Sequence, residues 1–188
     1  MKAISKSLKK NDPNHLNLGI RYGYIEQLDD ELLRISKESF DALSFNCYAL
    51  SPDHEKMNHA LEISGLPMII GEYHFGTVDR GLAQSLWQVN SQKERGDAFR
   101  YYTENAFAHR GLIGTGWFRW IDQNINGRTD GENYNCGFID VTDRPYPYMV
   151  DAAIETAKSL YEIHSGTKTP FHQAPNAVGH SPIPDLWE

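Results

Sequence analysis

The sequence has little cysteine and no clear pattern of metal ligands. Its two cysteines, Cys47 and Cys136, fall in different predicted elements and lack the close spacing of a zinc site. A disulfide between them stays open, although two buried thiols are the better interpretation. Cysteine content therefore says little about the compartment, and no metal or other cofactor is expected.

The sequence also lacks a long apolar run and an excess of positive charge. No stretch approaches the length of a membrane span, and the basic segment 1–10 has no apolar core of the signal-peptide kind. A net charge of −7 disfavours a nucleic-acid partner, which needs a basic patch. Aromatic residues make up 12% of the chain, and their flat rings can stack on sugars. The negative net charge of the chain favours sugars over nucleic acids as ligands.

Strand and helix patterns alternate along the chain. After a helical stretch at residues 1–10, strands are expected at about 16–22, 41–50, 67–73 and 112–120. Each is followed by a predicted helix, at about 29–39, 52–64, 91–109 and 147–164. This alternation indicates a parallel α/β sheet. Four strands do not close a barrel, which takes eight. The chain is therefore either a small open sheet or the second half of a barrel, and the start inside a helix favours the half-barrel. Residues 1–164 form the predicted domain, and 165–188 a proline-rich tail on the surface or partly disordered.

The segment Pro67–Gly76 is the centre of the functional prediction. Three apolar residues, Met68, Ile69 and Ile70, precede Gly71 and Glu72, which is typical of a strand buried on both faces that ends in a carboxylate. In β/α barrels, chemistry is placed at the carboxyl ends of the strands. Glu72 is therefore the candidate catalytic carboxylate.

The other strand ends carry polar and aromatic side chains that suit a sugar ring. Indole faces stack on the C–H faces of a pyranose, while amides, carboxylates and hydroxyls fix its hydroxyl groups. Trp117 and Trp120 lie three residues apart and face opposite sides, and Trp117 is the candidate platform. The candidates on the four strand ends are Arg21 and Tyr22, Asn46 and Tyr48, Glu72 and His74, and Trp117, Asp122 and Gln123.

Several segments resemble the β-agarases of glycoside hydrolase family 50, in order and over about residues 6–155. The segments that carry the resemblance are Asp12-Pro13-Asn14-His15-Leu16, Leu18-Gly19-Ile20-Arg21, Ser44-Phe45-Asn46-Cys47-Tyr48, Ile69 to Gly76 with Asp79-Arg80-Gly81, Trp117-Phe118-Arg119-Trp120 with Asp122-Gln123, and Gly127 to Tyr134 with Gly137-Phe138-Ile139-Asp140. Tyr73, Arg119, Trp120 and Ile121 depart from the family pattern, which leaves the sugar preference open.

The resemblance implies the C-terminal half, strands five to eight with their helices, of a (β/α)8 barrel in a retaining glycosidase that cleaves a galactan-type polysaccharide. It places Glu72 on the nucleophile, Tyr48 on the tyrosine that hydrogen-bonds it, and Trp117 on the aromatic floor of the sugar subsite. Further pocket positions fall on Arg21, Asn46, His74, Asp122 and Gln123. Complete family members suggest a secreted or periplasmic location.

One expected group is missing. The family's general acid/base is a glutamate after an asparagine at the end of strand four, and no such Asn-Glu pair follows a predicted strand here. Retention needs two carboxyl groups about 5–5.5 Å apart. The alternatives are a non-catalytic carbohydrate-binding or interaction module, and an unrelated small α/β hydrolase that pairs Glu72 with Asp122. The outer strands would be open edges, so we expect either pairing with a missing half-barrel or self-association of the chain.

Overall fold

The computed structural model describes residues 1–179 and divides into two compact units. The sheet unit comprises Met1–Cys47, Pro52–Glu72 and His109–Gly116. The loop unit comprises Tyr48–Ser51, Tyr73–Ala108 and the chain from Trp117 onward. Each unit is described by itself.

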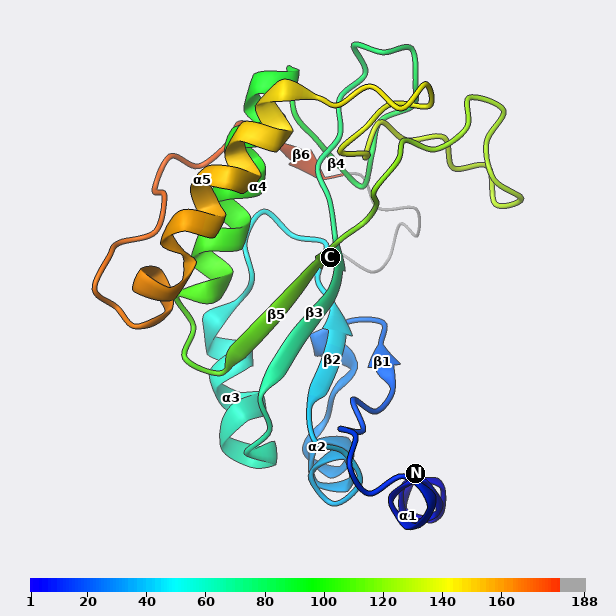
Figure 1. Ribbon diagram of the computed structural model, residues 1–188, viewed down its shortest axis with the longest axis vertical. Helices are drawn as coiled ribbons and strands as arrows, with labels where there is room; N and C mark the ends of the chain where they lie inside the picture. The colour runs from blue at the N-terminus through cyan, green and yellow to red at the C-terminus, as the bar shows by residue number, and fades with distance from the viewer. Residues whose placement is uncertain (180–188) are drawn as a thin grey trace. The chain divides into compact units, whose positions relative to one another are not determined.

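The sheet unit contains a four-stranded sheet in the order β1-β2-β3-β5 (Figure 1). Its strands are β1 (Arg21–Tyr22), β2 (Leu43–Asn46), β3 (Met68–Tyr73) and β5 (Leu112–Trp117). Strands β1 and β2 pair in parallel, as do β2 and β3. The expected parallel α/β sheet is therefore confirmed.

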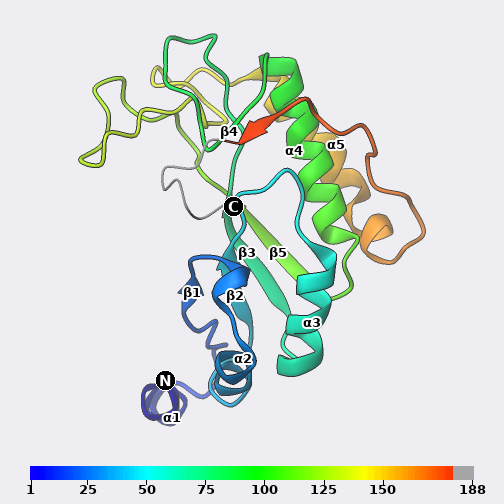
Figure 2. The ribbon, with the colours of Figure 1, turned by 180° about the vertical axis from the view of Figure 1, so that it is seen from behind.

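Helices α2 (Asp30–Lys37) and α3 (His54–Ser64) lie on the same side of this sheet (Figure 2). In α2, the Asp29 side chain accepts the Leu32 N–H and begins the helix. The predicted start of α3 at Ser51 and Pro52 is wrong by two residues. The Asp53 carboxylate caps the helix instead, since it accepts two amides, those of Glu55 and Lys56.

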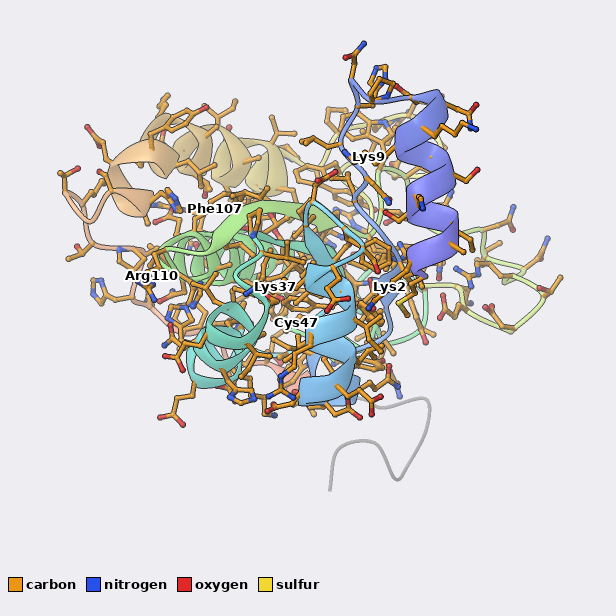
Figure 3. All side chains as sticks on the ribbon, turned by 90° about the horizontal axis from the view of Figure 1, so that it is seen from below. Lys2, Lys9, Lys37, Cys47, Phe107 and Arg110 are labelled. Atoms are coloured by element: carbon orange, nitrogen blue, oxygen red, sulfur yellow. The ribbon has the colours of Figure 1, made fainter. Side chains whose placement is uncertain are left out.

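Helix α1 (Lys2–Asn11) confirms the helical pattern at the start of the chain. Figure 3 labels Lys2 and Lys9 of this helix. Lys2 forms an ion pair with Glu38 and Lys9 one with Asp41, the latter 2.7 Å long, and these contacts join the helix to the rest of the sheet unit. The strand expected at 16–22 is mostly wrong, because only its last two residues pair. Residues Leu16, Leu18 and Ile20 are 46–72% exposed, with no layer of the described chain covering them.

The two faces of the sheet differ in burial, which corrects the prediction of a strand buried on both faces. Met68 and Ile70 of β3 are fully buried, whereas Ile69 and Gly71 between them are only partly buried. Ile113 on β5 is exposed. The apolar run of β3 therefore has a helix-covered face and a second face that the described chain leaves partly open.

The loop unit is built on two helices that pack against each other, α4 (Gln92–Phe107) and α5 (Pro147–His164), as Figure 1 shows. Ser91 caps α4 by accepting the Glu94 N–H, as the sequence predicts. The unit also contains a small antiparallel sheet of β4 (Trp87–Gln88) and β6 (Val178–Gly179), which the sequence did not predict. The tail therefore returns to the unit at least to residue 179, and the rest of the predicted tail, 180–188, lies outside the described residues.

Candidate active site

Glu72 stands near the carboxyl end of β3, and both of its carboxylate oxygens have partners from neighbouring strands. Nη1 of Arg21 lies 2.6 Å from Oε1, and Nδ2 of Asn46 donates to Oε2 over 3.1 Å. The Glu72 side chain is 18% exposed and that of Arg21 is 53% exposed. The structure thus brings together three of the predicted site residues, each from a different strand end.

Two backbone features make this contact possible. A Cβ on Gly71 would lie 2.5 Å from Cδ of Arg21, so the absence of a side chain there lets the arginine stem pass over β3. A register shift between Phe45 and Asn46 places Asn46 opposite Glu72. Such irregularities re-aim a side chain at a sheet edge.

Tyr24 is a residue of this region that sequence reasoning missed. It lies two residues beyond β1, and its backbone N–H donates to Oε1 of Gln27 over 3.2 Å. Burial, and then the negative charges of Glu26 and Glu72, raise the pKa of its phenol. A phenol with a raised pKa stays protonated and remains a hydrogen-bond donor near Glu72. By contrast Tyr22, a candidate from the sequence, is buried, and its hydroxyl bonds to Oγ of Ser36 over 2.8 Å.

In the loop unit, Tyr48 and His74 lie edge to face, with ring centroids 5.0 Å apart. His74 is 2% exposed and both of its ring nitrogens have backbone partners. Nδ1–H donates to the Phe118 carbonyl and Nε2 accepts the Leu86 N–H, each over 3.1 Å. Burial lowers the pKa of His74 to about 3. His74 therefore fixes two backbone segments as a neutral imidazole, which differs from the expected contact with substrate.

Trp117 is partly buried, and its indole is held on several sides. Tyr73, Phe99 and Phe138 contact it edge to face, with centroids 5.2–5.8 Å away. Nε1–H donates to the Cys136 carbonyl over 2.7 Å. Trp120 is 68% exposed and stacks on Phe138.

Asp122 and Gln123 are buried within the loop unit. The Asp122 oxygens accept from Nδ2 of Asn135, from the Gly137 N–H and from the Tyr146 hydroxyl, over 2.6–3.0 Å. The amide group of Gln123 donates to Glu132 and accepts the N–H of Tyr134, both over 2.7 Å. These partners satisfy the polar atoms of both side chains, so their geometry supports the loop at 118–137.

Comparison with known proteins shows which proteins the chain is similar to. No family model matches the chain. The chain is 36% identical over 165 residues to β-agarase A of Vibrio sp. strain JT0107, an alignment that covers 84% of this chain and 16% of the relative. It superposes on the solved structure of PfGH50B with a TM-score of 0.80 and 37% identity, over 86% of this chain and 24% of that one. The crystal structure of an agarase, AgWH50C, gives the same score and identity, over 86% and 25%. This is a β-agarase-like chain related to glycoside hydrolase family 50.

The β-agarase-like chain shares with these structures a mixed α/β fold with a parallel sheet. It spans about a sixth of the length of the curated relatives that it matches. Across residues 1–179, no helix is long and apolar enough to cross a membrane. The same residues contain no group of three or more histidine, cysteine or acidic side chains placed to hold a metal ion.

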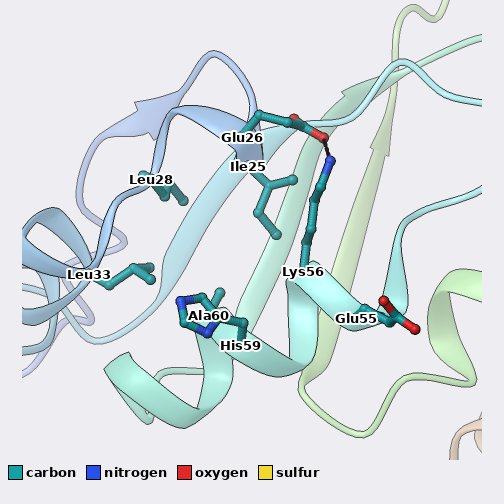
Figure 4. A pocket seen from close by; sticks show the side chains of 8 residues that line it. All are labelled: Ile25, Glu26, Leu28, Leu33, Glu55, Lys56, His59 and Ala60. Atoms are coloured by element: carbon teal, nitrogen blue, oxygen red, sulfur yellow. Dashed lines mark hydrogen bonds and ion pairs between the residues drawn. The ribbon is translucent and has the colours of Figure 1, made fainter.

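A separate cavity of about 310 Å³ lies in the sheet unit between the short helix η1 (Ile25–Gln27), α2 and α3 (Figure 4). Its apolar lining is formed by Ile25, Leu28, Leu33 and Ala60. At its edge, Nζ of Lys56 lies 2.8 Å from Oε1 of Glu26. None of the site residues predicted for the β-agarase-like chain lines this cavity.

Proposed function

We propose that this β-agarase-like chain carries the nucleophile of a retaining glycoside hydrolase that acts on an agar-type galactan, and that Glu72 is that nucleophile. The supporting observation is the placement of Glu72. It stands at the carboxyl end of a parallel strand, 2.6 Å from Arg21 and 3.1 Å from Asn46. The identity to β-agarase A supports the class of substrate.

In the proposed reaction, an oxygen of Glu72 attacks the anomeric carbon of a galactose unit. The carbon–oxygen bond to the leaving sugar breaks, a general acid protonates the departing oxygen, and a covalent glycosyl-enzyme results. Water then attacks the same carbon, loses a proton to the same group and releases the carboxylate. Arg21 and Asn46 hold the two carboxylate oxygens in place and so fix the direction of attack.

The sequence resemblance supports two further roles in the proposed reaction. It makes Trp117 the aromatic floor of the sugar subsite and Tyr48 the tyrosine that hydrogen-bonds the nucleophile. Oδ1 of Asn46 is buried and has no hydrogen-bond partner among the described residues, which suits a sugar hydroxyl as donor. His74, Asp122 and Gln123 hold the backbone of the loop unit in this proposal, because their polar atoms are already bonded to protein groups.

We further propose that the four strands are strands five to eight of a (β/α)8 barrel. The partly open face of β3 and the length of the relatives support this. The general acid then comes from the other half of the barrel, or the chain self-associates through its sheet edges.

The proposed function is tested in the whole protein that carries this chain, with agarose oligosaccharides as substrate. We expect Glu72→Gln to lower kcat by about three orders of magnitude or more, because the amide is a poor nucleophile. The matched control is Glu155→Gln, an exposed carboxylate of α5 paired with Lys158, which leaves kcat unchanged. Proton NMR of the first product shows whether the anomeric configuration is retained.

Three outcomes contradict the proposal. A Glu72→Gln enzyme with kcat within tenfold of the parent removes the nucleophile assignment. An inverted first product removes the retaining mechanism. If the whole protein binds agarose oligosaccharides but cleaves none, the carbohydrate-binding alternative replaces the enzyme.

A further inference from the structure

One tripeptide of the loop unit, Asn135-Cys136-Gly137, is fixed from two sides by buried charged groups. The carbonyl of its middle residue accepts the indole N–H of Trp117 over 2.7 Å. This hydrogen bond holds the N–H edge of the indole, whose ring also contacts Tyr73, Phe99 and Phe138.

Arg95 of α4 holds the two flanking carbonyls. Its Nη1 donates to the Asn135 carbonyl over 3.0 Å, and its Nη2 donates to the Gly137 carbonyl. Arg95 is 0% exposed, and its guanidinium lies 4.4 Å from the centre of the Tyr146 ring. Burial lowers the pKa of Arg95, and the negative charge of Asp122 opposes that shift.

Asp122 binds the N–H groups of the same tripeptide. Its carboxylate accepts the Gly137 N–H over 2.7 Å and the Asn135 side-chain amide over 2.9 and 3.0 Å. The guanidinium, which only donates, therefore binds carbonyl oxygens, and the carboxylate, which only accepts, binds N–H groups. Together they leave the Cys136 carbonyl at one position, directed at Trp117.

We propose that Arg95 and Asp122 are positioning residues for Trp117, acting through the Asn135-Cys136-Gly137 backbone. They set the orientation of the indole before a sugar arrives, which reduces the entropy lost on binding. The sugar-platform role of Trp117 rests on the proposed function, whereas the fixing of the indole does not.

The test follows the indole N–H of Trp117 by hydrogen exchange in ¹⁵N NMR, in the smallest soluble assembly that the chain forms. We expect Arg95→Met to speed this exchange at least tenfold, because the carbonyl that receives the N–H is no longer held. Backbone amides of α5, such as that of the buried Thr156, serve as internal reference and separate local loosening from unfolding of the loop unit.

The control and a second variant keep the test decisive. Arg100→Met alters the same helix at a residue bonded to Glu104 and stacked on Phe171, away from the tripeptide, and should leave the indole exchange unchanged. If Arg95→Met fails to fold, Asp122→Asn retains the shape and should still speed the exchange. Unchanged indole exchange in the folded variants overturns the proposal.

Binding of an agarose-derived tetrasaccharide separates the two claims. If the folded Arg95 or Asp122 variant exchanges its indole N–H faster and its Kd for the tetrasaccharide rises at least threefold, both claims stand. If indole exchange speeds up in that variant but Trp117→Ala binds the tetrasaccharide with the Kd of the parent, the positioning role stands and the platform role of Trp117 fails.

Discussion

At the residue scale, burial and hydrogen bonding divide the candidate site residues into two kinds. Arg21 and Asn46 reach the carboxylate of Glu72 from strand ends. His74 and Asp122 are buried with backbone or side-chain partners on each polar atom. In the proposed function the first kind contacts the substrate, and the second kind holds the backbone of the loop unit.

His74 should make stability depend on pH. Its folded pKa is about 3, whereas an unfolded imidazole has a pKa near 6.5. The unfolded chain therefore binds the extra proton between these values, so the unfolding free energy falls as pH drops from 6.5 towards 3, by up to about 1.4 kcal/mol per pH unit. Urea unfolding at pH 7, 6 and 5 measures this.

The comparison variant is His74→Gln, whose side-chain amide can also donate and accept a hydrogen bond but does not titrate in this range. We expect its stability to depend less steeply on pH than that of the parent. Equal slopes for the parent and His74→Gln would show that His74 is not held neutral.

At the element scale, the sequence predicted the order of strands and helices because apolar periodicity and caps are local signals. Helix α5 and the Ser91 cap are where the pattern places them. The long-range partners were not predictable in the same way. No sequence pattern near His74 predicts its hydrogen bonds with Leu86 and Phe118, and none near Arg95 predicts its contact with residues 135–137. Tyr24 was missed because it lies beyond the short strand, where alternation has ended.

Two glycines of neighbouring strands give a matched test of the sheet. A Cβ on Gly116 of β5 would lie 2.7 Å from the backbone oxygen of Gly71, which cannot move without disturbing β3. A Cβ on Gly71 would meet the flexible, exposed stem of Arg21. We expect Gly116→Ala to cost about 1–3 kcal/mol of unfolding free energy and Gly71→Ala to change it by about 0.5 kcal/mol or less.

Chemical denaturation of the two variants side by side measures the difference. Gly71→Ala should also displace Arg21 from Glu72, which a crystal structure of the variant would show. A stability loss in Gly71→Ala as large as that in Gly116→Ala would mean that the arginine stem is rigid, against the expectation from its exposure.

At the scale of the whole molecule, the sheet ends at β1 and β5, and both edges carry exposed apolar side chains. Leu18 and Ile20 precede β1, and Ile113 lies on β5. Open edges and exposed apolar groups favour pairing with another chain or segment. This fits the proposal that further strands complete a barrel in the whole protein.

We therefore expect the 188-residue chain alone to self-associate at micromolar to millimolar concentrations. Size-exclusion chromatography with light scattering measures the mass. Leu18→Lys with Ile20→Lys should shift the chain towards monomer, whereas Tyr161→Lys, at an exposed residue of α5, should not. A parent chain that is monomeric throughout this range would count against the half-barrel proposal.

The two thiols give each unit its own chemical reporter. Cys136 is the middle residue of the tripeptide that holds Trp117, and burial raises the pKa of its thiol to about 12. Cys47 is buried in the sheet unit. An alkylating reagent reaches either thiol only when its surroundings open, so the two labelling rates time the opening of each unit. Equal rates would indicate that the units open as one cooperative body, and unequal rates that one opens first.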